Sequence, residues 1–303
     1  MASRRALLKL AGLSALSLPM AALPAQARAA GAGTRPDAIA AAPDLAALEA
    51  ASGGRLGVAL LRDGAWDVQF GHRVDERFPM ASTFKALLAS AVLARADRGT
   101  LSLDQRLTVR EADMLEHAPV TGRHVGRDLT VRDLCQATMI WSDNPAANLL
   151  LPLVDGPVGL TAFLRAAGDA VTVCARNEPL ANVFAVGDPR DTTSPQAMAG
   201  NLQRFVLGDV LSPASRLQLT DWLIGNRTGD ARIRAAAPAG WRVGDKTGGA
   251  SGISNDIGVL WPADGGRPWL LACYLQGSAL DGAARDAVVR RASELALAYA
   301  RGA

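Results

Sequence analysis

The stretch Phe78-Pro79-Met80-Ala81-Ser82-Thr83-Phe84-Lys85 leads into an apolar run, Ala86–Ala96, that is rich in helix-forming residues. Pro79 disfavours helical geometry in the residue before it, so we expect a helix to begin at about Ser82. Lys85 then lies one turn later on the same helix face. A hydroxyl at a helix N-terminus lies beside unpaired backbone N–H groups, which favour developing negative charge. The spacing predicts a serine nucleophile with an amine within reach of its proton.

Ser-x-x-Lys is a short pattern that also arises by chance, as an N-cap serine followed by a solvated lysine. The catalytic interpretation of Ser82 and Lys85 therefore depends on the rest of the chain. The chain has 303 residues, enough to bury a sizeable core in one large domain or two smaller ones. Apolar residues make up 49% and charged residues 20%, which is ordinary for a folded protein.

Residues 1–29 are predicted to be a cleaved export signal. The twin-arginine pattern Ser3-Arg4-Arg5-Ala6-Leu7-Leu8-Lys9 precedes an apolar run, Leu10–Leu23, and small-residue cleavage sites follow it. This order is typical of a Tat-type signal, with a Sec-type signal as the alternative. No later segment is long and apolar enough to cross a membrane. The mature protein is expected to be periplasmic or secreted, with no membrane partner.

Loss of the signal changes the net charge of the chain. The signal carries four cations, Arg4, Arg5, Lys9 and Arg28, and no acid, so its removal takes the formal charge from +3 to −1. The basicity of the full sequence is therefore no evidence for a nucleic-acid partner, and the mature chain has no basic stripe. Cys135, Cys174 and Cys273 lie in apolar contexts and are expected to be buried thiols. One disulfide stays possible in an oxidising compartment, but no metal site is expected.

Strand and helix patterns divide the mature chain, residues 30–303, into two parts. Strands are predicted at Arg55–Leu61, Trp66–Phe70, Trp241–Thr247, Ser254–Trp261 and Trp269–Gln276. Helices are predicted at Asp44–Ala51, Ser82–Asp97, Val131–Met139, Asn144–Leu153, Val158–Ala167, Pro195–Leu207, Pro213–Ile224 and Ala283–Arg301. Strands at both ends of the chain are too few to be stable apart, so we expect them to share one sheet.

The predicted fold class is therefore α+β. A five-stranded antiparallel sheet flanked by the terminal helices is built from residues 40–75 and 225–303, and residues 76–224 form an all-helical part inserted into it. The cleft between the two parts is the expected place for a site. A monomer is the default expectation for such a chain.

Two further short motifs carry side chains suited to acyl transfer. Ser142-Asp143-Asn144 lies between two predicted helices, where the Ser142 hydroxyl is able to pass a proton to a leaving nitrogen and the Asn144 amide to bind a substrate amide. Lys246-Thr247-Gly248-Gly249 ends a predicted strand and offers a positive charge, a hydroxyl and a backbone N–H for an oxyanion. Taken singly, each is also an ordinary turn.

Together the three motifs, in this order on helix, loop and strand, resemble those of the penicillin-recognising serine acyltransferases. A further stretch, Arg176–Thr193, resembles the omega loop of class A β-lactamases, which the penicillin-binding transpeptidases lack. Deacylation needs a carboxylate that deprotonates a water beside the acyl-serine, and Glu178 is the candidate, with the Asn182 amide orienting the water. Arg176 and Asp191 are placed to form an ion pair at the neck of this loop.

The resemblance to class A β-lactamases implies hydrolysis of the β-lactam amide of penicillins and cephalosporins, with resistance as the consequence. Ser82 is the implied nucleophile, and its proton leaves through Lys85 or through water to Glu178. The resemblance also implies that Arg232 helps Lys246 and Thr247 to bind the drug carboxylate, and that no cofactor is needed. It further implies that the cysteine bridge of many members cannot form, because Ala89 stands opposite Cys135.

Two other functions are compatible with the acylation motifs. A D-alanyl-D-alanine carboxypeptidase of the penicillin-binding class would use Ser82 and Lys85 without an omega-loop glutamate. A non-catalytic β-lactam sensor would become acylated and stay so. Glu178 and Asn182 argue against both, since they supply the means of releasing the acyl group.

Overall fold

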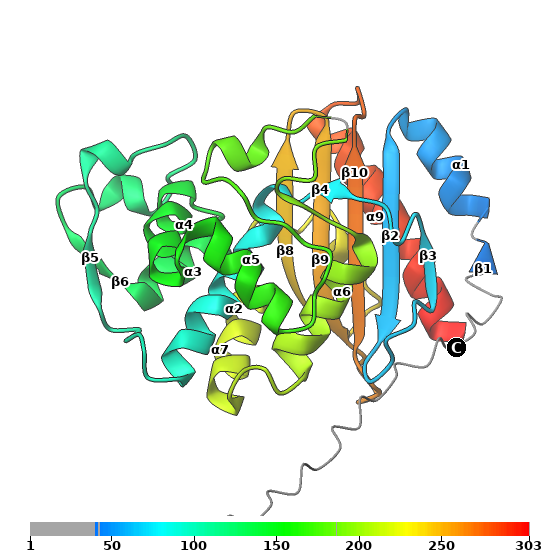
Figure 1. The fold of residues 1–303 in the computed structure, drawn as a ribbon. Coiled ribbons are helices and arrows are strands. Elements are labelled where there is room, and N and C mark those ends of the chain that lie inside the picture. The colour runs from blue at the N-terminus through cyan, green and yellow to red at the C-terminus, as the bar shows by residue number, and fades with distance from the viewer. Residues whose placement is uncertain (1–39, 42, 186, 303) are drawn as a thin grey trace, which may run out of the picture. The chain divides into compact units, whose positions relative to one another are not determined.

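The computed structural model describes residues 40–41, 43–185 and 187–302, in which a β-sheet has helices on both faces (Figure 1). The strands are β1 (Ala40–Ala41), β2 (Arg55–Arg62), β3 (Phe70–His72), β4 (Phe78–Pro79), β5 (Arg106–Thr108), β6 (Asp128–Thr130), β7 (Thr192–Thr193), β8 (Arg242–Ala250), β9 (Ile253–Trp261) and β10 (Trp269–Gln276). The predicted signal, residues 1–29, lies outside the described residues.

The α-helices are α1 (Pro43–Ser52), α2 (Phe84–Asp97), α3 (Val131–Ile140), α4 (Asn144–Leu150), α5 (Gly156–Ala166), α6 (Pro195–Leu202), α7 (Pro213–Ile224), α8 (Ile233–Ala236) and α9 (Gly282–Gly302). Short 3₁₀ turns are η1 (Ala81–Thr83), η2 (Glu111–Asp113), η3 (Thr121–Arg123), η4 (Leu151–Val154) and η5 (Leu180–Asn182), and η6 (Gln203–Leu207) is a π-helical turn. Among the described residues no single helix is long and apolar enough to cross a bilayer, although the bent pair Asn144–Val154 and Gly156–Ala166 together has such a length and composition.

The main sheet has the strand order β1-β3-β2-β10-β9-β8. The predicted five-stranded antiparallel arrangement is confirmed, and the two-residue β1 adds to the edge by pairing in parallel with β3. The N-terminal β2 pairs with the C-terminal β10 over its whole length, from Arg55 opposite Gln276 to Arg62 opposite Trp269. The two ends of the chain therefore build one sheet, as the α+β prediction requires.

The predicted second strand at Trp66–Phe70 is wrong in its position, because pairing with β2 begins only at the end of this segment. Trp66 is 53% exposed, and the guanidinium of Arg204 lies 4.7 Å from the centre of its ring. This stacking holds the indole against η6 instead of in the sheet. The backbone joins the sheet where the N–H of Gln69 donates to Leu60, and the strand itself is β3.

Strand β10 is buried on both faces and separates two hydrophobic clusters. Its residues Leu271, Cys273 and Leu275 pack toward α1 and α9, whereas Leu270 and Tyr274 pack toward the helical segments that follow β4. This alternation is the period of a strand whose successive side chains point to opposite faces. It explains why Trp269–Gln276 is an almost continuous apolar run.

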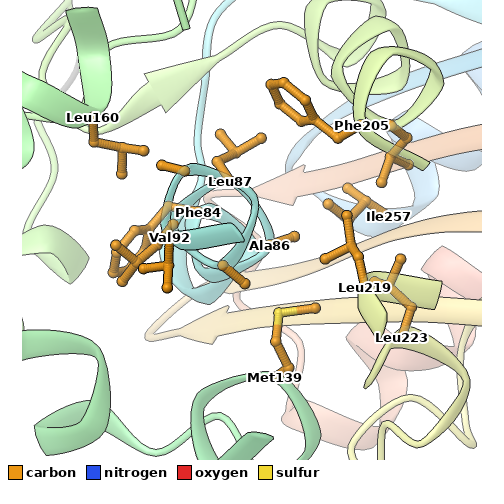
Figure 2. Close-up of a cluster of buried hydrophobic side chains, with 14 of the residues drawn as sticks. Phe84, Ala86, Leu87, Val92, Met139, Leu160, Phe205, Leu219, Leu223 and Ile257 are labelled. Atoms are coloured by element: carbon orange, nitrogen blue, oxygen red, sulfur yellow. The ribbon is translucent and has the colours of Figure 1, made fainter. Parts of the chain in front are cut away.

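Helix α2 lies in the middle of the larger cluster. Every residue from Phe84 to Ala94 is buried, including Lys85, as expected for a helix that is apolar on all sides. Figure 2 shows its side chains surrounded by residues of other helices and of strand β9: Met139, Leu160, Phe205, Leu219, Leu223 and Ile257. Because α2 touches so many elements, the residues at its N-terminus are held rigidly.

The predicted α-helix from Ser82 starts two residues later than expected, at Phe84, and η1 precedes it. The carbonyl of Met80 accepts hydrogen bonds from the N–H and the hydroxyl of Thr83, over 3.2 and 2.8 Å, and closes a tighter turn. The Nδ2 group of Asn255 donates to the same carbonyl over 3.2 Å. These bonds favour 3₁₀ over α geometry at Ser82.

The described residues form one compact unit by their contacts. The division into residues 40–75 with 225–303, and 76–224, stays a prediction, because no boundary inside this unit separates the two parts. The fold does bring η1 and β8 into contact, next to the N-terminal end of α2. This contact joins the Ser-x-x-Lys motif to the Lys-Thr-Gly motif.

Candidate active site

Ser82 and Lys85 lie at the centre of the site, on η1 and in the first turn of α2. The Lys85 ammonium donates to the Ser82 hydroxyl over 3.0 Å, and also to the backbone oxygen of Ser142 over 2.8 Å. It donates to Oδ1 of Asn144 over 2.6 Å as well. Burial lowers the pKa of Lys85, and the carboxylate of Glu178 opposes this change. The lysine is held by oxygen acceptors in a position to exchange a proton with Ser82.

Ser142 lies in the loop between α3 and α4, and its φ of 60° places it in the left-handed region. Asp143 stabilises this loop because its carboxylate caps α4 and accepts from the N–H and hydroxyl of Thr121, over 2.9 and 2.7 Å. The Ser142 hydroxyl consequently meets two ammonium groups, at 3.3 Å from Lys85 and 3.1 Å from Lys246. A strained backbone fixed in this way is common where a side chain must point into a site.

Glu178 lies on the loop between α5 and α6, and its Oε1 is 3.3 Å from Nζ of Lys85, both side chains being fully buried. Asn148 of α4 fixes the backbone of Glu178 by accepting from its N–H over 3.0 Å and donating to its oxygen over 2.8 Å. Asn182 donates to Oε2 of Glu178 over 2.5 Å. Oε1 of Glu178 and Oδ1 of Asn182 are buried and accept no hydrogen bond. Each partner therefore keeps one acceptor for a bound donor.

The neck of this loop is closed by Arg176 and Asp191, as the sequence predicts. Nε of Arg176 donates to Oδ2 of Asp191 over 2.6 Å, and the N–H groups of Ala175 and Arg176 both donate to Oδ1. The backbone oxygen of Asp191 accepts from the N–H of Met80 over 2.9 Å. Since Met80 precedes the Ser82 turn, this bond ties the loop that carries Glu178 to the nucleophile.

Asp191→Asn is expected to lower the free energy of unfolding by about 1–3 kcal/mol, because a mostly buried carboxylate loses its charge-assisted bonds to Arg176. Chemical denaturation measures the change. Asp188→Asn is the matched control, since Asp188 forms an ion pair with the exposed Arg190 in the same loop and is expected to change stability by less than about 0.5 kcal/mol. Equal effects of the two substitutions would contradict a structural role for the neck.

Lys246 and Thr247 lie on β8, at the end that meets η1. The fully buried Lys246 donates to the Ser142 hydroxyl over 3.1 Å and to the backbone oxygen of Thr247 over 2.9 Å. Burial, reinforced by the charge of Lys85, lowers the pKa of Lys246 to about 7. A cation in this setting gains from any anion bound beside it.

Gly248 and Gly249 serve different purposes. A Cβ atom on Gly248 would lie 2.7 Å from the oxygen of Met80 and 3.2 Å from the nitrogen of Ser82, so this glycine lets β8 pack against the Ser82 turn. A Cβ on Gly249 would point toward Arg232, whose Nη2 lies 3.9 Å away. Gly249 is exposed, and the edge of β8 is open at this residue. The backbone N–H groups near Ser82 and Gly249 thereby flank one pocket.

Arg232 precedes α8, and three hydrogen bonds hold its guanidinium. Its Nε donates to Asp286 of α9 over 2.8 Å, and its Nη1 donates to the backbone oxygens of Asn255 over 2.7 Å and Gly248 over 3.2 Å. These bonds fix the guanidinium at the rim of the pocket, where Nη2 faces Gly249. Asp286 was not predicted, because it is 54 residues away and meets Arg232 only in the fold.

The side chains converge on an open pocket of about 260 Å³. Its lining includes seven of the predicted residues: Ser82, Ser142, Asn144, Asn182, Arg232, Thr247 and Gly249. The other four, Lys85, Glu178, Lys246 and Gly248, are buried directly behind them. Thr228 also lines the pocket and was missed, because Asn226-Arg227-Thr228-Gly229 matches no motif. His117 lies at the rim, where its Nε2 and the backbone oxygen of Trp141 are 2.8 Å apart.

The described residues contain no group of three or more His, Cys, Asp or Glu side chains arranged to hold a metal ion. The three cysteines are buried and unpaired, which confirms the prediction of buried thiols. Burial raises the pKa of the Cys273 thiol to about 12.

Residues 40–300 match the model of the β-lactamase enzyme family. The chain is 55% identical over 300 residues to β-lactamase L2 of Stenotrophomonas maltophilia, covering 98% of both chains. It is 46% identical over 231 residues to β-lactamase CTX-M-8 of Citrobacter amalonaticus, covering 76% of this chain and 79% of that one.

Solved structures give the same family. A β-lactamase from Xanthomonas campestris has a TM-score of 0.81 and 54% identity, and the match covers 84% of this chain and 94% of that chain. A class A β-lactamase of the last common ancestor of Gram-negative bacteria has a TM-score of 0.81 and 57% identity, and the match covers 84% of this chain and 97% of that chain. The chain therefore belongs to the β-lactamase enzyme family and, within it, to the class A β-lactamases.

Proposed function

We propose that this enzyme hydrolyses the β-lactam amide of penicillins and cephalosporins through an acyl-enzyme on Ser82, and so confers resistance to these antibiotics. One observation carries the proposal: the Lys85 ammonium lies between the Ser82 hydroxyl, at 3.0 Å, and Oε1 of Glu178, at 3.3 Å. A nucleophile and a buried carboxylate that share one amine are suited to forming an ester and then releasing it.

Acylation needs the neutral amine of Lys85. In the wild type Glu178 takes the ammonium proton across the 3.3 Å contact, and burial of Lys85 favours the neutral amine even without the carboxylate, so acylation does not depend on Glu178. The neutral amine then takes the proton of Ser82 as its Oγ attacks the lactam carbonyl carbon. The backbone N–H groups of Ser82 and Gly249 stabilise the oxyanion, and the buried setting strengthens these bonds. The lowered pKa of Lys85 favours the neutral amine that this step needs.

The ring nitrogen leaves with a proton from the Ser142 hydroxyl. Ser142 is re-protonated by Lys85, which lies 3.3 Å away and holds the proton taken from Ser82. Lys246, 3.1 Å from the same hydroxyl, stabilises negative charge that develops on Ser142. The C–N bond is then broken, and an ester joins the acyl group to Ser82. The proton that Glu178 received returns to Lys85 across the 3.3 Å contact, so a carboxylate and an ammonium are again present for deacylation.

Deacylation needs a water molecule beside the ester. Apart from the ion pair of Oε1 with Lys85, Oε1 of Glu178 and Oδ1 of Asn182 are buried and accept no hydrogen bond, so one water is able to donate to both. Glu178 takes a proton from that water as the water attacks the ester carbon, and the Ser82 oxygen leaves with a proton from Lys85. The bond between Asn182 and Glu178 fixes the carboxylate for this step.

Substrate binding uses the charges at the other end of the pocket. The drug carboxylate binds beside Thr247 and Arg232, which line the pocket, and the charge of Lys246, buried behind them, also attracts it. Asn144 bonds the side-chain amide of the drug. Its Nδ2 donates to the backbone oxygen of Glu116 over 3.0 Å, which sets the orientation of the amide group. No metal or cofactor takes part.

A hydrolysis assay tests the proposal most simply. Wild type is expected to open the ring of a chromogenic cephalosporin at many turnovers per enzyme, and Ser82→Ala to lose this activity without losing its fold. Cleavage of a D-alanyl-D-alanine peptide in place of the cephalosporin would point to the carboxypeptidase. A single acylation of wild type without turnover would point to a sensor.

The value of kcat/KM is expected to decline above about pH 7. Lys246 has its pKa lowered to about 7 by burial, so above this pH the free enzyme loses the positive charge that attracts the drug carboxylate. The decline is expected to approach tenfold per pH unit. In kcat the same step should appear at higher pH, because a bound carboxylate favours the ammonium form.

Lys246→Arg is the control for this pH profile. A guanidinium stays protonated throughout the range, so the step near pH 7 is expected to disappear even if overall activity is lower. Steady-state kinetics between pH 6 and 9 measure both enzymes. A wild-type kcat/KM that stays constant to pH 9 would contradict a role for the charge of Lys246 in capturing substrate.

We further propose that residues 1–29 direct Tat export, so that the enzyme acts in the periplasm or outside the cell as a monomer without a membrane partner. The twin-arginine pattern Ser3–Lys9 supports the route. Among the described residues the exposed large apolar side chains are spread over several segments, and only Leu180 and Val183 share one loop, which supports a monomer: Trp66, Trp141, Val158, Leu180, Val183 and Leu217. Cell fractionation of an Arg5→Lys variant and light scattering of the mature chain test the two points.

A further inference from the structure

Thr228 lines the pocket beside Thr247, and the oxygen atoms of the two hydroxyls are 2.5 Å apart. We propose that Thr228 is a positioning residue for substrate recognition: its hydroxyl holds the hydroxyl of Thr247, and the direction of this hydrogen bond reverses when a carboxylate binds. The inference rests on the proposed function, because the anion concerned is the carboxylate of the β-lactam. It assigns a role to a residue outside the three motifs.

The orientation of Asn226 determines where the protons lie in the free enzyme. Nδ2 of Asn226 donates to Oδ2 of the buried Asp245 over 2.6 Å, and Arg234 donates to the other oxygen of the same carboxylate. The amide oxygen of Asn226 must therefore face the opposite way, toward Thr228. Gly229 permits this approach, since a Cβ there would lie 1.7 Å from Oδ2 of Asp245.

Oδ1 of Asn226 accepts two hydrogen bonds from Thr228, one from its N–H over 3.1 Å and one from its hydroxyl over 2.8 Å. A hydroxyl has one proton, so Thr228 has none left for Thr247. In the 2.5 Å contact Thr247 is therefore the donor. The free enzyme directs the proton of Thr247 away from the pocket and presents only lone pairs of that oxygen to a ligand.

Binding of a carboxylate reverses the hydrogen bond between Thr228 and Thr247. Thr247 turns its proton toward the anion, and two oxygens 2.5 Å apart require a proton between them, so Thr228 now donates to Thr247. Oδ1 of Asn226 is not left unpaired, because it keeps the N–H of Thr228. A hydroxyl that accepts one bond is a stronger donor in the next, so Thr228 strengthens the bond from Thr247 to the carboxylate.

The proposal predicts a loss that is specific for the carboxylate. Thr228→Ala removes the hydroxyl and is expected to raise KM for a penicillin by about tenfold, the effect of one hydrogen bond to a charged group, while kcat changes less than about twofold. Thr228→Ser keeps the hydroxyl and is expected to match wild type. With the methyl ester of the same penicillin, Thr228→Ala and wild type should have equal KM, since the ester offers no anion.

A double-mutant cycle shows whether Thr228 acts through Thr247. In a Thr247→Ala background, Thr228→Ala is expected to change KM by less than about twofold, because the hydroxyl that it positions is gone. Equal losses for acid and ester, a Thr228→Ser variant as weak as Thr228→Ala, or full additivity in the cycle would overturn the inference. These outcomes require a wild type that hydrolyses penicillin, so they differ from failure of the proposed function, in which wild type does not.

Discussion

Glu178→Gln should convert the enzyme from one that turns over into one that reacts once and stops. The substitution keeps the shape of the side chain and its bond from Asn182, but removes the carboxylate that accepts a proton from the deacylating water. Proton transfer by a positioned base contributes about 10²–10⁴-fold, so kcat is expected to fall by about 10³-fold. A rapid-mixing experiment with a chromogenic cephalosporin should show a burst of one equivalent followed by a slow phase.

Glu111→Gln is the matched control, because Glu111 is an exposed acid on η2 and forms no part of the pocket. This variant should turn over at the wild-type rate. A Glu178→Gln enzyme that shows neither a burst nor turnover would place the need for the carboxylate in acylation, through the proton that it takes from Lys85. One that turns over normally would exclude Glu178 as the deacylation base.

Lys85→Met is expected to abolish acylation and also to destabilise the fold. The variant has no amine 3.0 Å from the Ser82 hydroxyl, so the burst itself should be lost. It also leaves the fully buried Glu178 without its cation, and breaking a buried ion pair from one side typically costs about 3–5 kcal/mol. Chemical denaturation and rapid mixing measure the two effects separately.

The double variant Lys85→Met, Glu178→Gln distinguishes lost chemistry from lost structure. With both charges removed, neither member of this pair is left as an uncompensated buried ion, so most of the stability should return. Acylation should not return, because the amine is still missing. Recovery of acylation together with stability would show that the loss in Lys85→Met was a consequence of unfolding.

The main parts of the fold were predictable because they depend on local patterns. Strands with both faces buried are continuous apolar runs, and β10 begins and ends where the sequence predicts. The turn at Ser82 was only partly predictable: helix formers indicate a helix, but the bonds from Thr83 and Asn255 to Met80 tighten its first turn. Asn255 is far from Met80 in the sequence, so no local pattern contains this information.

The site was predictable where its residues form motifs and not where they act at long range. Lys85, Ser142 and Lys246 belong to short motifs, and the fold brings their side chains within hydrogen-bond distance. Thr228 and Asp286 meet their partners Thr247 and Arg232 only through the packing of distant elements. Single residues of this kind have no signature in one sequence.

The edge of the sheet shows a second reason why the sequence-based prediction of the fold was incomplete. An alternating pattern at Trp66–Phe70 predicts a strand there, but the stacking of Arg204 on Trp66 removes that residue from the ladder. Tertiary contacts of this kind override a local preference for strand. The consequence is confined to the β2–β3 connection, which does not contribute to the pocket.

Mass spectrometry of the intact enzyme mixed with a penicillin tests the central claim most directly, that Ser82 forms an ester which Glu178 releases. For wild type the account predicts a transient adduct of the drug mass that disappears as substrate is consumed. For Glu178→Gln it predicts a long-lived adduct, which peptide mapping locates on Ser82. A wild type that stays acylated, or an adduct on any other residue, would contradict the account.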